Sequence, residues 1–291
     1  MDNKAGFKCG GINSEEIPES IIHSTGISFY KAHTDRRAMA AVAVQKKELD
    51  KDSICRVPFC VTVEAEALGA KVIVGSDSAG PRFTGGYTAA SLEQLVEMPE
   101  LDLEKGRIQE VLQCIRLLRD EGHIVALNAE GPLTILGMLL DSMVLYRGIS
   151  KQKQLVKQVL QLVEDRIVKY IEAGIEHGAQ IISYADPSGV SEIVGPKLYR
   201  ELSGKSTCNI LKRLEEKLDG AIIHLCGKTS LSMKEAGLCT VKRLEFAESL
   251  TYGEAICRFL NDDNVKILGH NCMKITPLLM HTPVVWQIEL L

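Results

Sequence analysis

The sequence of 291 residues lacks the features that mark several broad classes of protein. It has no uninterrupted apolar run of transmembrane length, and residues 1–4 lead into polar, glycine-rich sequence rather than a secretory leader. We therefore expect a cytoplasmic protein that does not act at a membrane. The formal net charge is −4 and no long basic run occurs, so no positive field indicates a nucleic-acid partner.

Two short motifs are also missing. None of the nine cysteines belongs to a C-x-x-C motif, and their odd number and irregular spacing are typical of core thiols in a cytosolic chain, with a few candidates for metal. No G-x-G-x-x-G follows the early predicted strands, which argues against a dinucleotide-binding fold.

Strand-like and helical patterns alternate along the chain. Residues 151–177 form the clearest helical pattern, and short apolar runs predict strands at 71–74, 123–128, 180–186, 221–226, 241–247 and 265–269. This alternation predicts an α/β fold with a parallel sheet and right-handed crossovers. We interpret it as a single-domain (β/α)8 TIM barrel over residues 21–291, preceded by an irregular N-terminal arm over residues 1–20. A doubly wound open sheet is the alternative.

The most informative stretch is 221–228, with the sequence Ala-Ile-Ile-His-Leu-Cys-Gly-Lys. Side chains alternate between the two faces of a strand, so His224 and Cys226 are expected to project from the same face. Imidazole and thiolate are zinc ligands, so this pair predicts half of a zinc site. The same spacing recurs at His270 and Cys272, after the apolar run 265–268.

Polar residues stand at the ends of five predicted strands. They are Asn128 and Glu130, Tyr184 and Asp186, His224 and Cys226, Glu245 and Glu248, and His270 and Cys272. In a TIM barrel the carboxyl ends of the strands carry the catalytic residues, so we expect these residues to form one site.

Several stretches resemble the sequences of one known family. They are Glu-Ala-Glu-Ala-Leu-Gly-Ala at 64–70, Gly-Pro-Leu-Thr at 131–134, Ala-Asp-Pro at 185–187 with Val-Gly-Pro at 194–196, and His-Leu-Cys-Gly at 224–227. The family they resemble is the zinc-dependent corrinoid methyltransferases of the uroporphyrinogen decarboxylase superfamily, the methylcobamide:coenzyme M methyltransferase group. The H-x-C-G motif is the zinc signature of this group, and the resemblance covers most of the chain after about residue 50.

The resemblance implies a TIM barrel with one Zn²⁺ and methyl transfer from a methylcorrinoid, carried by a partner protein, to a small-molecule acceptor. It implies His224, Cys226 and Cys272 as the zinc ligands. Only about forty-five residues separate the H-x-C pair from Cys272, which is shorter than expected for the coenzyme M enzymes.

The remaining candidates divide into two groups. We predict catalytic roles for Asp186, Glu245, Glu248 and His270, and cofactor-binding roles for Asn128, Glu130 and Tyr184. A turn cap before Pro187 is an equally good interpretation of Asp186, and Glu64 and Glu66 are assigned to a solvated helix face.

Three protein ligands leave a tetrahedral zinc ion with one open position, which is typical of catalytic sites. An acceptor thiol in that position would be held as a zinc thiolate, attack the methyl group on cobalt in line, and leave the corrinoid as Co(I). His270 either orients a metal ligand without binding the metal itself or completes a closed, structural Cys₂His₂ set.

Three other functions stay open. The acceptor could be tetrahydrofolate or another molecule without a thiol. The superfamily's other activity, porphyrinogen decarboxylation, calls for an arginine-lined cleft, whereas the arginines of this chain at 36, 37, 56 and 82 are scattered and an arginine-rich N-terminal motif is missing. A non-catalytic zinc- or corrinoid-binding protein with a closed metal site is the third.

Overall fold

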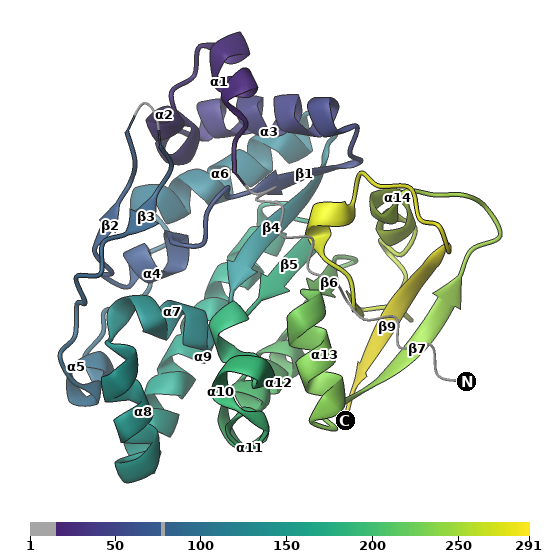
Figure 1. Ribbon diagram of the computed structural model, residues 1–291. Coiled ribbons are helices and arrows are strands. Elements are labelled where there is room, and N and C mark those ends of the chain that lie inside the picture. The colour runs from purple at the N-terminus through teal and green to yellow at the C-terminus, as the bar shows by residue number, and fades with distance from the viewer. Residues whose placement is uncertain (1–15, 77–78) are drawn as a thin grey trace.

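The computed structural model describes residues 16–76 and 79–291 (Figure 1). Most of the arm predicted over residues 1–20 lies outside these described residues. The centre of the fold is a seven-stranded sheet with the strand order β1-β4-β5-β6-β8-β9-β7. Within the two described ranges, no helix is both long enough and apolar enough to cross a membrane.

The sheet has a parallel part and an antiparallel part. The parallel strands are β1 (Ile54–Val57), β4 (Ile124–Glu130), β5 (Ile181–Ala185), β6 (Ile222–Leu225) and β8 (Ile267–Gly269). The long strand β9 (Val284–Leu290) pairs antiparallel with β8 on one side and with β7 (Cys239–Glu245) on the other. A separate antiparallel pair consists of β2 (Val72–Ile73) and β3 (Arg82–Phe83).

Helices connect and cover the strands. They are α1 (Glu19–Thr25), α2 (Phe29–Thr34), α3 (Arg36–Asp50), α4 (Val63–Ala67), α5 (Leu92–Val96), α6 (Gly106–Asp120), α7 (Pro132–Leu139), α8 (Ser142–Lys151), α9 (Lys153–Glu176), α10 (Ser191–Val194), α11 (Pro196–Leu198), α12 (Gly204–Leu214), α13 (Gly227–Glu235) and α14 (Tyr252–Cys257). Short 3₁₀ segments are η1 (Pro187–Gly189) and η3 (Met273–Ile275), and η2 (Tyr199–Ser203) is a π-helical segment that runs into α12.

The two faces of the sheet belong to two different apolar cores. Val125 and Leu127 of β4 pack into the larger core with residues of α3, α6, α9 and α12. Ala126, between them in the sequence, points to the opposite, inner face, where it joins Ile181, Ile222 and Tyr252 in a second core. The inner face is therefore covered at this level by α14 and its neighbours.

The prediction of an eight-stranded parallel barrel holds in part. The chain is α/β with a mainly parallel sheet, but the pairing begins at β1 and ends at β7, and no ladder joins these two strands in the part of the chain described. The run at 71–74, predicted as a sheet strand, instead forms the outlying hairpin with residues 82–83. The sequence pattern missed β1, because Arg56 interrupts its four residues.

The packing of α9 on β4 requires a small residue at Gly174. A Cβ atom at this position would lie well inside contact distance of Leu127 Cδ2, whereas a Cβ on the helical Gly137 of α7 would have nothing within 4 Å. We expect Gly174→Ala to lower the free energy of unfolding by about 1–3 kcal/mol through overpacking. Gly137→Ala should leave it unchanged or raise it by up to about 1 kcal/mol. Urea unfolding of both variants tests this, and equal effects would contradict it.

Candidate functional site

A pocket of about 270 Å³ opens at the carboxyl ends of β4, β5 and β6. Its polar lining comes from these strand ends and from the segments that follow β1, β6 and β8. The residues are Cys60, Asn128, Glu130, Ser183, His224, Cys226, Lys228, Cys272 and Lys274. The pocket therefore contains all three predicted zinc ligands.

Strand register places the pocket residues in one layer. Asn128 is the direct partner of Ser183, and Ser183 is the direct partner of His224. One step down the strands, the aligned residues are Ala126, Ile181 and Ile222, which belong to the inner apolar core. Because side chains two apart share a face, the pocket is a polar layer directly above an apolar floor.

His224 is fully buried, and its two ring nitrogens differ in their surroundings. Nε2 lies 2.8 Å from the Tyr252 hydroxyl, which comes from the start of α14. Nδ1 is buried and makes no hydrogen bond with any described residue. Burial lowers the pKa of His224 to about 4, so the ring is neutral at physiological pH. A neutral imidazole with one nitrogen fixed and the other available is the form in which histidine binds metals.

The two cysteines lie at the starts of helical segments. Cys226 directly precedes α13, where its carbonyl accepts from the Ser230 N–H (2.9 Å). Cys272 directly precedes η3, where its carbonyl accepts from the Ile275 N–H (3.0 Å). Both side chains are partly exposed and line the pocket. Their backbones are held, and both residues line the pocket that His224 borders.

The donor set has the chemistry of a zinc site, but it is not assembled as one. Among the described residues, no group of three or more His, Cys, Asp and Glu side chains is arranged to hold a metal ion. The available buried Nδ1 of His224 and the two thiols of the same pocket fit a zinc ion in type and location.

His270 does not line the pocket. Its backbone is left-handed, with φ 65°, and its ring Nδ1 lies 2.9 Å from the Ser230 hydroxyl. The backbone N–H of His270 donates to the same hydroxyl oxygen (2.8 Å), and the ring packs near Trp286. Burial and the nearby Lys234 charge lower its pKa to about 4. This placement does not support a closed Cys₂His₂ set.

Asp186 and Tyr184 are also placed away from the pocket lining. Asp186 is buried and caps the start of α7: its carboxylate accepts from the backbone N–H of Leu133 (3.2 Å) and of Thr134 (2.9 Å), and from the Thr134 hydroxyl (2.8 Å). Burial raises its pKa to about 6. Tyr184 belongs to the larger core on the other face of the sheet. Their positions favour structural roles over the catalytic and binding roles predicted for them.

The two glutamates predicted near the metal lie on the surface. Glu245 pairs with Arg243 (3.1 Å) and Glu248 pairs with Arg258 (2.9 Å). Both carboxylates are more than half exposed and neither lines the pocket. The end of β7 does not reach the pocket because β9 separates β7 from the parallel strands, and this position argues against the catalytic roles predicted for the two glutamates.

Asn128 and Glu130 line the pocket as predicted, whereas Glu64 is not on a solvated face. The Asn128 amide donates to the Pro58 carbonyl (2.9 Å), which ties β4 to the segment after β1. The Glu130 N–H donates to the Glu64 carboxylate (2.9 Å), which is buried beside it. Burial raises the pKa of Glu64 to about 7. Glu66 is partly buried and pairs with Arg107.

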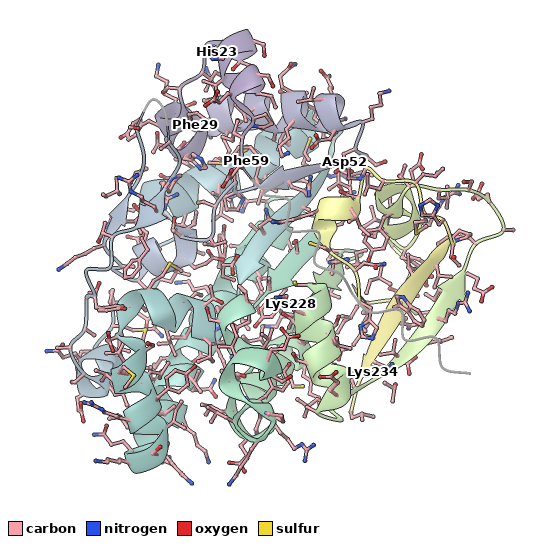
Figure 2. All side chains as sticks on the ribbon, in the orientation of Figure 1. His23, Phe29, Asp52, Phe59, Lys228 and Lys234 are labelled. Carbon is pink, nitrogen blue, oxygen red and sulfur yellow. The ribbon has the colours of Figure 1, made fainter. Side chains whose placement is uncertain are left out.

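Several residues that line the pocket or contact its lining had not been predicted. Lys228 follows the H-x-C-G motif directly, and Figure 2 shows it at the start of α13. Cys60 comes from the stretch after β1, and its sulfur accepts from the Arg107 guanidinium (3.2 Å). Tyr252 lies 28 residues beyond His224 and carried no sequence signal, because only the folded chain brings α14 onto the inner face.

Comparison with known proteins places this chain in a family. The model of the family described as "Uroporphyrinogen decarboxylase (URO-D)" matches residues 15–271. The chain belongs to the uroporphyrinogen decarboxylase family. A solved structure described as a methyltransferase from Methanosarcina mazei is similar with a TM-score of 0.64 and 24% identity, covering 75% of this chain and 65% of that one.

Curated relatives in this family carry methyltransferase names. "Methylcobamide:CoM methyltransferase MtaA" of Methanosarcina barkeri is 26% identical over 79% of this chain and 68% of its own. "Methylated-thiol--coenzyme M methyltransferase" of Methanosarcina mazei is 27% identical over 70% of this chain and 54% of its own. These relatives confirm the resemblance to the corrinoid methyltransferases of the superfamily. The chain spans about half to two thirds of the length of the relatives it matches.

The buried Glu64 predicts a pH-dependent contribution to stability. Its folded pKa of about 7 lies above the ordinary value of 4.5, so the native state binds the proton more tightly than the unfolded state between these values. The contribution of Glu64 to stability is therefore present below about pH 4 and is lost as the pH rises towards 7. Relative to wild type, Glu64→Gln should gain roughly 1–3 kcal/mol between pH 5 and pH 8.

Urea unfolding at four pH values across this range measures the difference. Glu97→Gln, at an exposed carboxyl, is the matched control. A difference between wild type and Glu64→Gln that stays constant with pH would show that Glu64 is ionised in the folded protein throughout.

Proposed function

We propose that the protein transfers a methyl group from a methylcorrinoid, carried by a partner protein, to a small thiol, at a zinc ion in the pocket. The pocket supports this proposal because it gathers His224, Cys226 and Cys272, and family members with the names quoted above act on methylcobamide and thiol compounds. His224 Nδ1 is the observation that carries the metal assignment: among the buried side-chain nitrogens without a hydrogen-bond partner in the described residues, it belongs to the one histidine that lines the pocket with Cys226 and Cys272.

Each protein residue has a defined task in this proposal. His224, Cys226 and Cys272 would hold the metal, and the Tyr252 hydroxyl fixes the orientation of the His224 ring through Nε2. When bound, zinc lowers the pKa of a thiol that enters its open position, so that the thiol is a nucleophile at neutral pH. The apolar floor below the layer of His224 keeps water from approaching that position from the core side.

The volume of the pocket indicates which of the two substrates can enter it. A volume of about 270 Å³ lies just below the range of typical ligand pockets, about 300–1,000 Å³. A small thiol fits inside, whereas a corrinoid macrocycle must be presented at the mouth by the protein that carries it. Lys228 and Lys274 line the pocket, so an acceptor with an anionic group remote from its thiol would be favoured.

The decarboxylase activity of the superfamily receives less support. A substrate with many carboxylates calls for arginines in the cleft, whereas no arginine is among the described lining residues and their only cations are Lys228 and Lys274, since His224 is neutral. A non-thiol acceptor such as tetrahydrofolate receives less support as well, because it has no thiol whose pKa the metal could lower.

Zinc content and X-ray absorption at the zinc edge test the metal site. We expect about one zinc per chain with two sulfur ligands near 2.3 Å, rising to three when 2-mercaptoethanesulfonate is added. His224→Gln and Cys226→Ser should lose most of the metal. Cys60→Ser is the matched control, because this thiol lines the same pocket without a proposed bond to zinc. A wild-type chain that takes up no zinc would sink the proposal.

Free methylcobalamin as donor tests the acceptor. Demethylation, followed by its absorbance, should depend on an added thiol. Replacing Lys228 and Lys274 by alanine should raise KM for 2-mercaptoethanesulfonate roughly tenfold, as expected for the loss of about 1.5 kcal/mol of charge-assisted contact. The neutral thiol 2-mercaptoethanol is the control, and its KM should not change. An equal change for both thiols would show that the lysines do not recognise an anionic group.

A further inference from the structure

A buried cluster of charges lies one layer below the pocket, on the inner face of β1. Arg56 pairs in register with Ala126, at the level where β5 and β6 carry only apolar side chains on this face. Its guanidinium lies 3.5 Å from Asp52 and 3.9 Å from Asp50, and Lys46 lies 3.0 Å from Asp50. The side chains of Arg56 and Asp52 are only 5% and 1% exposed.

This cluster is bonded to the segment that carries Cys272. Arg56 Nη1 donates to the carbonyl of Met273 (2.8 Å). Met273 is the residue that follows Cys272 in the chain. The Thr276 hydroxyl, at the other end of the same short segment, donates to Asp52 (2.5 Å). Figure 2 shows Asp52 beside η3. Residues more than two hundred positions apart in the sequence are therefore joined at both ends of η3.

The opposite side of the segment is also held. The Gly253 N–H of α14 donates to the Thr276 carbonyl (2.8 Å), and a Cβ at Gly253 would approach that oxygen to 3.0 Å. The segment 273–276 is thus enclosed between β1 and α14. Tyr252, the residue before Gly253, is the one that fixes the His224 ring.

Stability alone does not account for this cluster. Burying two charges costs several kcal/mol per ion before pairing, and apolar replacements of similar volume are often as stable or more stable. In some proteins, buried polar or ionic groups serve instead to select one geometry. Here the geometry that they would select is the position of the Met273–Lys274 peptide, one residue beyond Cys272.

We propose that Arg56 and Asp52 are positioning residues that hold the Cys272 thiol where it can join His224 and Cys226 on the metal. This inference rests on the proposed function, because it assumes a metal in the pocket. Since Cys272 directly precedes η3, and η3 is bonded to Arg56 and Asp52, the position of this ligand depends on how the loop after β8 is held. Metal affinity and the number of bound thiolates should therefore respond to a residue that touches neither metal nor substrate.

Cobalt(II) in place of zinc gives a direct readout, because thiolate-to-cobalt absorption reports the number of bound sulfurs. We expect Arg56→Met to lose about half of this absorption and to bind zinc 10–100-fold more weakly than wild type in a competition titration. Arg56→Lys keeps a charge beside Asp52 and a donor for the Met273 carbonyl, so it should recover part of both. Cobalt spectra and zinc affinities are measured without any enzymatic assay.

Arg166→Met is the matched control. Arg166 is equally buried, with a side chain 6% exposed, and it also donates to backbone carbonyls, those of Pro99 (3.1 Å) and Leu162 (3.0 Å). Its loss should lower stability without changing the cobalt spectrum. If Arg56→Met fails to fold, Thr276→Val removes the other bond of η3 with no change in volume, and it should give the same spectral change in a milder form.

The outcomes separate the inference from the function on which it rests. A wild-type cobalt spectrum and zinc affinity in Arg56→Met, or in folded Thr276→Val when Arg56→Met does not fold, would overturn the positioning role and leave the proposed function standing. Cys272→Ser with an unchanged spectrum would also overturn it, since there would be no ligand to position, while His224 and Cys226 could still bind the metal. A wild-type chain that binds neither cobalt nor zinc would overturn the proposed function and the inference together.

Discussion

The site depends on one buried imidazole. The His224 ring is fully enclosed, its Nε2 lies within hydrogen-bond distance of the Tyr252 hydroxyl, and its Nδ1 has no partner among the described residues. An unsatisfied buried polar atom costs about 1–3 kcal/mol of stability. This atom lies in the first polar row of the sheet, directly above the row of apolar side chains. The rest of the arrangement follows from that level: Ser183 and Asn128 lie beside His224 in register, and the two cysteines lie above it.

Much of the sheet was predictable because strands β4, β5, β6 and β8 each begin with a short apolar run and have glycine or proline close by in the sequence. The same rule failed for the apolar run at 71–74. Val72 and Ile73 do not join the main sheet but pair with residues 82–83 in a small antiparallel hairpin. It also failed at β1, where Arg56 occupies an inner-face position. The antiparallel direction of β9 was not predictable, because it follows from which strands are its neighbours rather than from its own residues.

The two H-x-C pairs show how far face alternation can be trusted. His224 lies within β6, and Cys226 is the first residue after this strand. Residues two apart therefore still share a face, and both line the pocket. The second pair begins after β8 has ended at Gly269, and the left-handed backbone at His270 turns the chain out of the strand direction. Cys272 therefore reaches the pocket while His270 turns to Ser230. Asp186 follows β5 and is two residues from Tyr184, whose side chain belongs to the larger core on the other face, and it serves the start of α7.

The position of β9 has a consequence for the order in which the sheet is completed. In the described part of the chain, β7 pairs with β9 alone, yet β9 is the last strand along the sequence. During synthesis β7 therefore has no ladder to join until residues 284–290 have been made. An unpaired strand of this kind is a template for association with other chains. Once β9 has paired with both β7 and β8, the facing edges of these two strands are no longer unpaired.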